Sequence, residues 1–123
     1  MIFGIGIDVI EVKRVAEKLD KPLFKERIFS ASEIEYCEKY HNKMERYAGR
    51  FAAKEAFLKA IGEGWQASFS FSDIEIINDE KGKPKINPLN GVAELVINKN
   101  INKMHVSIAH VKEMATSIVI LET

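Results

Sequence analysis

The strongest constraint on the fold of this chain is a long helical segment predicted over residues 44–61. Its second half reads Arg50-Phe51-Ala52-Ala53-Lys54-Glu55-Ala56-Phe57-Leu58-Lys59-Ala60, and the glycines at positions 62 and 64 are expected to end the helix. The small residues before Glu55 allow another part of the chain to come close to this helix. The segment therefore combines charged side chains with a surface suited to tight packing, and we expect the fold to be built around it.

The other predicted elements come in an order that indicates the fold class. We expect a buried strand over residues 1–8, a helix over 10–20, and a helix that starts at Ser30 or Ser32 and runs to about residue 41. A strand over 69–77, a hairpin turn over 78–84, a short helix near 92–96, and antiparallel strands over 104–108 and 115–121 follow. Helices come first and most strands last, which predicts an α+β fold. We expect a single domain, residues 1–123, with an antiparallel sheet packed against the long helix.

Composition and charge exclude several classes of protein. The formal net charge is zero, which argues against the overall basic field of a nucleic-acid-binding protein. No apolar run reaches the length needed to cross a membrane, and the apolar first seven residues lack the basic start of a signal peptide. The one cysteine, Cys37, is interpreted as a structural thiol. A cytoplasmic location is the simplest expectation.

Two carboxylates are candidates for a metal site. Asp8 ends the first predicted strand, and Glu55 lies on the long helix with Lys59 one turn further on. A carboxylate at the end of a buried strand is costly unless it is paired or bound to a metal, although Asp8 could instead cap the following helix. Glu55 could instead form an ordinary surface ion pair with Lys59. If the two carboxylates meet, they can share a hard cation such as Mg²⁺.

Bases near these carboxylates are candidates for phosphate binding. Arg46, Arg50 and Lys54 follow one another at intervals of four residues, so they repel one another unless an anion relieves them. The simpler interpretation is a solvated helix face. His110 closes the strand predicted to begin at residue 104 and could orient a phosphate, although a purely structural histidine is as consistent with its spacing. The residues alone thus predict a metal and phosphate site without naming a substrate.

These residues also carry a resemblance to a known family. Gly4-Ile5-Gly6-Ile7-Asp8, then Ala48-Gly49-Arg50-Phe51-Ala52-Ala53-Lys54-Glu55-Ala56, then Gly82-Lys83-Pro84, and finally Ser107-Ile108-Ala109-His110 follow in this order. Together they resemble the holo-[acyl-carrier-protein] synthases, the small single-domain type of 4′-phosphopantetheinyl transferase. The resemblance covers nearly the whole chain.

The resemblance implies an activity and roles for individual residues. The family transfers 4′-phosphopantetheine from coenzyme A to a serine of acyl carrier protein in fatty-acid biosynthesis, and it requires Mg²⁺. By position, Asp8 and Glu55 match metal ligands, and Lys59 matches a lysine near the diphosphate. The resemblance also implies coenzyme A contacts, and the candidates for them in this chain are Arg50, Lys54, Gly82, Lys83, Pro84 and His110. Family members are homotrimers with active sites between subunits, which implies the same assembly here.

A basic stretch near the N-terminus is a candidate surface for a protein partner. Residues 13–27 hold six bases against three acids, and helical spacing relates Arg14, Lys18, Lys21 and Lys25. Pro22 could split these four bases into two short faces. Since acyl carrier proteins are acidic, such a surface would steer them to the site. Two alternatives remain: a transferase for a specialised carrier domain, and a non-catalytic module that binds an acidic helical partner.

Overall fold

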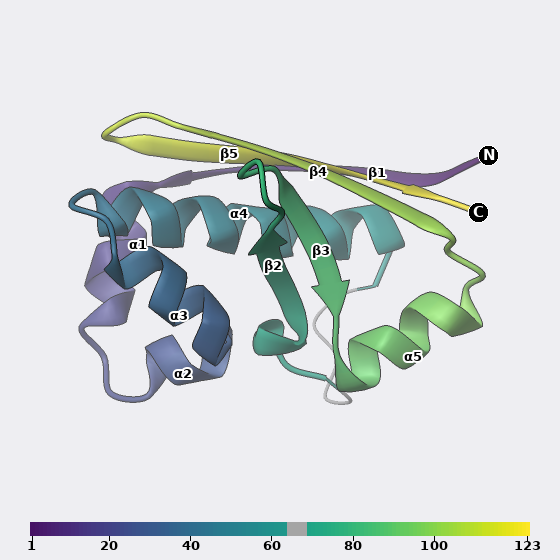
Figure 1. Cartoon of the computed structure of the whole chain (residues 1–123), viewed down its shortest axis with the longest axis horizontal. Coiled ribbons are helices and arrows are strands. Elements are labelled where there is room, and N and C mark those ends of the chain that lie inside the picture. Colours follow the sequence, from purple (N-terminus) through teal and green to yellow (C-terminus); the bar gives the residue numbers. More distant parts are fainter. Residues whose placement is uncertain (64–68) are drawn as a thin grey trace.

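A computed structural model describes residues 1–63 and 69–123. A sheet of three long strands covers one side of helix α4 (Lys43–Ile61), and the remaining helices and a small hairpin lie on the other side (Figure 1). None of the helices in the described part of the chain is both long enough and apolar enough to cross a membrane. The α+β class and the packing of an antiparallel sheet on the long helix are confirmed.

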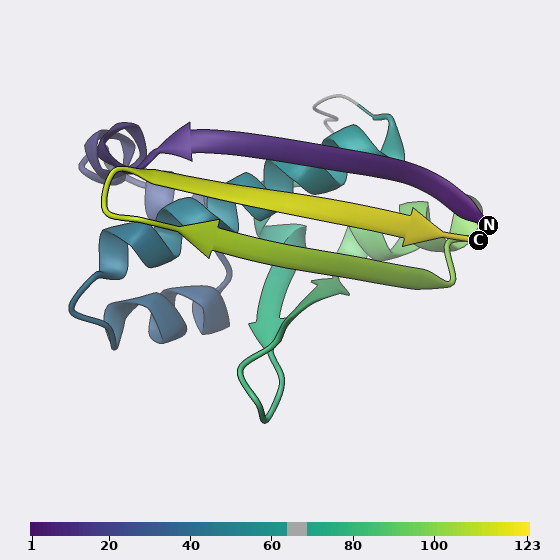
Figure 2. The ribbon, with the colours of Figure 1, turned by 90° about the horizontal axis from the view of Figure 1, so that it is seen from above.

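The three-stranded sheet has the order β1-β5-β4, with every pair antiparallel (Figure 2). Its strands are β1 (Ile2–Glu11), β4 (Lys103–His110) and β5 (Met114–Glu122). β1 extends three residues beyond its expected end at Asp8, because its pairing with β5 continues to Glu11 opposite Met114. Asp8 therefore lies within a strand and does not cap the next helix, whose N-cap is Glu11.

The first strand, expected to be buried, is buried on one face only. From Gly4 to Ile10 its even-numbered residues lie on the side of α4, whereas Ile5, Ile7 and Val9 point outward and are more than half exposed. Ile118 of β5 lies opposite Ile7 and is also exposed. A single chain thus presents an apolar outer sheet face, the kind of surface that marks an interaction site.

Two glycines allow β1 to lie directly on α4. A Cβ at Gly4 would fall 1.8 Å from the carbonyl oxygen of Ala60, and one at Gly6 would fall 1.8 Å from that of Ala56. No side chain can occupy that space, so the glycines and alanines together permit backbone contact between strand and helix. The close approach predicted from the small residues is confirmed.

The helices between β1 and α4 form a small layer beside the long helix. They are α1 (Val12–Leu19), α2 (Phe24–Ile28) and α3 (Ala31–Glu38). The chain breaks after α1 around Pro22, and Leu23 takes a left-handed conformation with φ 67°. Ser30 is the N-cap of α3 in a capping box with Glu33, as predicted for one of the two serines. Gly62 ends α4 with φ 78°.

The remaining elements form a hairpin and a helix. Strands β2 (Ile74–Asn78) and β3 (Pro84–Pro88) pair antiparallel, and α5 (Asn90–Asn98) follows. The strand expected from residue 69 starts only at Ile74, because Phe71–Asp73 form a short 3₁₀ helix (η1) capped by Ser70. The alternation of aromatic residues before Ile74 therefore does not mark a strand, and the prediction of a strand from residue 69 is wrong for residues 71–73. Residues 64–68, including the glycine at 64 expected at the end of the long helix, lie outside the described residues.

Candidate active site

Asp8, Glu55 and Lys59 meet where β1 crosses α4. The Lys59 ammonium donates to an Asp8 carboxylate oxygen at 3.2 Å and to the backbone carbonyl of Ile7 at 2.9 Å. Lys59 therefore pairs with the strand, in place of the ion pair with Glu55 considered from the sequence. The three side chains come from β1 and α4, and the close backbone contacts at Gly4 and Gly6 hold these two elements together. The cluster predicted from the sequence is thus assembled within one chain.

The electrostatics of this cluster suit a cation. Burial, together with the nearby Asp8 carboxylate, raises the pKa of Glu55, while Lys59 and Lys18 oppose that shift. A divalent ion between two neighbouring carboxylates would offset the repulsion that raises the pKa of Glu55. Within residues 1–63 and 69–123 no group of three or more potential ligands gathers around a metal position. A pair of carboxylates matches Mg²⁺, which usually binds one or two carboxylates and fills its shell with water and substrate phosphates.

A second group of predicted residues surrounds a cavity of about 110 Å³ beside β4. Arg50, Gly82, Pro84 and His110 all line it, although they are far apart in the sequence. They arrive there from α4, from the hairpin turn and from the end of β4. Of the predicted coenzyme A residues, Lys83 lies outside this cavity and lines a neighbouring groove between β3 and β4.

Arg50 is the hydrogen-bond donor in this cavity that is best placed to bind an anion. Its side chain is 4% exposed, its guanidinium stacks 3.9 Å from the Tyr36 ring, and one terminal nitrogen donates to Asn78. Its Nε has no hydrogen-bond partner among the described residues. Because a buried donor without a partner is costly, this nitrogen is suited to an anionic ligand.

The hairpin turn and His110 complete the cavity wall. The Asn78 amide donates to the carbonyl of Gly82 at 2.8 Å, and Gly82 has φ 84°, a conformation that favours glycine. The Nδ1 of His110 lies 2.8 Å from a Glu45 carboxylate oxygen. A ligand in the cavity would therefore meet the Nε2 edge of the ring.

The two groups lie on opposite sides of one chain. Asp8 is on β1 and His110 is on β4, and these are the two edges of the sheet (Figure 2). Arg50 and Glu55 are five residues apart on α4, which separates their directions by about 140° around the helix. The turn of the β2–β3 hairpin projects on the β4 side (Figure 2). One chain therefore carries two separate half-sites, a carboxylate half-site (Asp8, Glu55 and Lys59) and an anion half-site (Arg50, His110 and the Gly82 turn).

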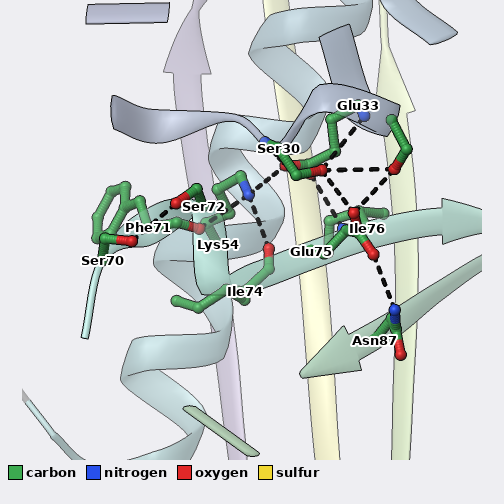
Figure 3. A network of polar contacts seen from close by, with 11 residues as sticks. Ser30, Glu33, Lys54, Ser70, Phe71, Ser72, Ile74, Glu75, Ile76 and Asn87 are labelled. Atoms are coloured by element: carbon green, nitrogen blue, oxygen red, sulfur yellow. Dashed lines mark hydrogen bonds and ion pairs between the residues drawn. The ribbon is translucent and has the colours of Figure 1, made fainter. Parts of the chain in front are cut away.

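Lys54 does not join either half-site. Its side chain is fully buried, and its ammonium donates to a Glu33 carboxylate oxygen at 2.7 Å and to the carbonyls of Phe71 and Ile74 (Figure 3). These three acceptors use all three of its protons, so the expected phosphate contact from Lys54 is not supported. The exposed basic stripe through Arg46, Arg50 and Lys54 does not exist as a solvated face, since Arg50 is also buried.

The basic residues near the N-terminus form two short faces. Arg14 and Lys21 are exposed, whereas Lys18 leans over the ring of Phe51 and Lys25 pairs with Glu38 at 3.3 Å. The break around Pro22 separates the α1 bases from the α2 base, as one of the two sequence interpretations proposed. Since Lys18 also acts on Glu55, the α1 face borders the carboxylate half-site.

Sequence reasoning missed three residues of the anion half-site. Tyr36, Glu45 and Asn78 hold Arg50 and His110 in place through the contacts described above. The sequence indicates Asn78 only as part of a turn, and nothing in the spacing of Tyr36 indicates that it stacks on Arg50. These side chains act through tertiary neighbours, which explains why the sequence pattern does not reveal them.

Comparison with known proteins identifies the class. Residues 4–119 match the family described as the 4′-phosphopantetheinyl transferase superfamily. The chain is 44% identical over 124 residues to the holo-[acyl-carrier-protein] synthase of Clostridium kluyveri, covering 99% of this chain and 91% of the relative. It belongs to the 4′-phosphopantetheinyl transferase superfamily.

Solved structures give the same result at the level of the fold. The holo-[acyl-carrier-protein] synthase of Neisseria meningitidis superposes with a TM-score of 0.90 at 30% identity, covering 100% of both chains. The holo-(acyl-carrier-protein) synthase of Bacillus anthracis in complex with CoA (3′,5′-ADP) has a TM-score of 0.83 at 42% identity, covering 100% of this chain and 98% of that one. Within the superfamily, the chain is therefore one of the holo-[acyl-carrier-protein] synthases.

Proposed function

We propose that this protein transfers 4′-phosphopantetheine from coenzyme A to a serine of apo acyl carrier protein, in fatty-acid biosynthesis. The products are holo acyl carrier protein and adenosine 3′,5′-bisphosphate. The observation that carries the proposal is the coexistence of a carboxylate pair beside a lysine with a separate anion cavity around a buried arginine. Relatives of the same length are holo-[acyl-carrier-protein] synthases, which argues against a non-catalytic module.

Asp8 and Glu55 are proposed to hold Mg²⁺ in the reaction. When bound, the ion neutralises charge on the diphosphate as the bond to the leaving group breaks. Lys59 lies 3.2 Å from Asp8, so it is placed to stabilise the same developing charge. Its contact with the Ile7 carbonyl orients the ammonium relative to the strand.

Arg50 and His110 are proposed to bind phosphate groups of coenzyme A. The unpartnered Nε of Arg50 and the cavity beside it support this role. The turn Gly82-Lys83-Pro84 is proposed to lie near the adenine, since Gly82 and Pro84 line that cavity and Lys83 lines the adjoining groove. Stacking on Tyr36 fixes the orientation of the planar Arg50 guanidinium, which favours directional contact with a phosphate.

A homotrimer is proposed to complete the active site. The carboxylate and anion half-sites lie at opposite edges of the sheet in one chain, so a neighbouring copy is needed to bring complementary halves together. The apolar outer face of the sheet, with Ile5, Ile7 and Ile118 exposed, supplies a surface that assembly would cover.

The α1 basic face is proposed to receive the acidic carrier protein. Exposed Arg14 and the neighbouring Lys18 lie next to the carboxylate half-site, and Lys21 follows at the break before α2. Lys25 is engaged by Glu38 and contributes less free charge to this surface. Such charges act mainly on the rate of association with a partner.

Mass spectrometry tests the proposed reaction directly. Apo acyl carrier protein incubated with this protein, coenzyme A and Mg²⁺ should gain the mass of one 4′-phosphopantetheine group on its serine. Asp8→Asn and Glu55→Gln variants should remain folded and lose most of this activity. An unmodified carrier with the wild-type protein, or full activity in either folded variant, would contradict the assignment.

A further inference from the structure

The buried ion pair of Glu33 and Lys54 has no part in the reaction proposed above, although it lies between the two half-sites along α4. Both side chains are 0% exposed, and they come from α3 and α4. Burying two charges costs free energy that their attraction alone repays only partly. A pair of this kind is therefore expected to do something that apolar packing cannot do as well, and the contacts in Figure 3 indicate what that is.

The pair forms hydrogen bonds with backbone groups on the free edge of strand β2. Backbone hydrogen bonds join Asp73 to Leu89 and Asp79 to Lys83 at the two ends of the β2–β3 hairpin. Because backbone direction alternates along an antiparallel strand, the backbone groups of Ile74 and Ile76 point to the other edge of β2. There Lys54 donates to the Ile74 carbonyl at 2.7 Å, and the second Glu33 oxygen accepts from the Ile76 amide at 3.0 Å. The two charged groups thus take the place of a third strand.

A second carboxylate ties the same strand to α3. Glu75 accepts from the hydroxyls of Ser30 and Ser32 at 2.6 and 2.8 Å, and its other oxygen accepts from the Asn87 amide of β3. Two carboxylates therefore join α3 and the hairpin: Glu33 accepts from the β2 backbone, and Glu75 accepts from the serines at the start of α3. Lys54 adds the link from this joint to α4.

The hairpin is consequently fixed to α4 at both ends of β2. Lys54 holds Ile74 at its start, and Arg50 binds Asn78 at its end. The helix positions are about 6 Å apart, while the strand positions are about 13 Å apart, so the two attachments define the angle at which the hairpin crosses the helix. Asn78 in turn holds the carbonyl of Gly82.

We infer that Glu33 and Lys54 are positioning residues for the anion half-site. They act by fixing the β2–β3 hairpin on α4 so that the Gly82–Pro84 turn lies beside Arg50. This inference rests on the proposed function, because it assigns coenzyme A to that half-site. Lys54 itself does not contact the substrate, because its ammonium is fully engaged by Glu33, Phe71 and Ile74. Its loss changes where the turn lies relative to Arg50 and leaves Asp8 and Lys59 in place on β1 and α4.

The test uses two variants and a matched control. Lys54→Met removes the ammonium at nearly the same length, and Glu33→Gln with Lys54→Met also removes the charge that the single change leaves unpaired. Val92→Ala, which shortens a fully buried side chain of α5, is the control for a loss of stability elsewhere. For each protein, kcat and KM for coenzyme A and for the carrier are measured, with direct titration of coenzyme A.

We expect the KM and Kd for coenzyme A to rise about tenfold in both variants. This is the lower end of the loss that follows removal of a group that orients a metal ligand, which is a comparable indirect role. The kcat at saturating coenzyme A and the KM for the carrier should stay within about twofold of wild type, and Val92→Ala should leave all of them unchanged. If Lys54→Met does not fold, the double variant decides the matter. Folded variants with wild-type affinity for coenzyme A, or with a fall in kcat alone, would overturn the inference, whereas a wild-type protein that fails to bind coenzyme A would overturn the proposed function instead.

Discussion

Replacing Gly6 with alanine should separate β1 from α4 and disable the carboxylate half-site. The new Cβ would stand 1.8 Å from the Ala56 carbonyl oxygen and 2.7 Å from the Ala60 nitrogen. Real Cβ atoms do not approach within 3.0 Å of other atoms, so the strand must move by at least 3.0 minus 1.8, or 1.2 Å. The obstructing atoms are backbone, and no rotamer change can relieve them.

The size of the effect follows from this displacement. Overpacking typically costs 1–3 kcal/mol, and a backbone obstruction places Gly6→Ala near or above about 3 kcal/mol. For a chain of this size, that loss lowers the Tm by roughly 10 °C. Asp8 moves with the strand, and a displacement of about 1 Å at reacting groups can lower the rate about 100-fold.

Denaturant unfolding and steady-state kinetics measure the two effects of Gly6→Ala. Gly49→Ala is the stability control, because its Cβ would meet only a methyl group of the Ile108 side chain, at 2.8 Å. That side chain can shift, and alanine is favoured over glycine within a helix by about 1 kcal/mol, so this variant should keep near wild-type stability. If the free energy of unfolding of Gly6→Ala remained within about 0.5 kcal/mol of the wild-type value and its kcat were normal, the reasoning from close packing would be wrong.

Three further predictions concern other parts of the chain. The hydrogen bond from Tyr47, with further contributions from Lys43 and Lys25, lowers the pKa of Glu38 from 4.5 to about 2, so the stabilisation is present above pH 4.5 and is lost as the pH falls toward 2. Tyr47→Phe should cost about 1 kcal/mol at neutral pH and weaken the acid dependence of unfolding in that window, and an unchanged acid-unfolding curve would contradict this. Burial raises the pKa of Cys37 to about 12, so a thiol reagent at pH 8 should label it only on unfolding, and rapid labelling of the native protein would disagree. Ile118→Lys on the exposed sheet face should give folded monomers by sedimentation with little activity, whereas a fully active monomer would exclude a shared site.

Much of the fold could be predicted because local chemistry determines it. The serine cap at Ser30, the glycine stop at Gly62 and the turn before Pro84 act within a few residues, and all are present in the structure. The strand end was placed too early because β1 continues only through its pairing with β5, more than a hundred residues away. Pairing partners at that separation leave no local pattern.

Sequence reasoning grouped the side chains correctly where their chemical type indicates their neighbours, and incorrectly where burial decides what a side chain contacts. Asp8 and Lys59 do meet, and Arg50 and His110 do share a cavity. Lys54 has the same helical spacing as its basic neighbours, so the sequence cannot tell that the edge of β2 and Glu33 cover it. The separation of the two half-sites likewise depends on strand order, which sequence periodicity does not contain.

Mixing two inactive variants tests the central claim that the active site is shared between copies of the chain. Asp8→Asn removes the carboxylate half-site and Arg50→Met removes the anion half-site, and each variant alone should be nearly inactive. Co-expressed in equal amounts, they assemble at random, and about one quarter of sites should join an intact carboxylate half from one subunit to an intact anion half from its neighbour. A shared site predicts recovery of about that fraction of wild-type activity in carrier modification. A mixture as inactive as either variant alone would show that both halves must come from the same chain, and would contradict it.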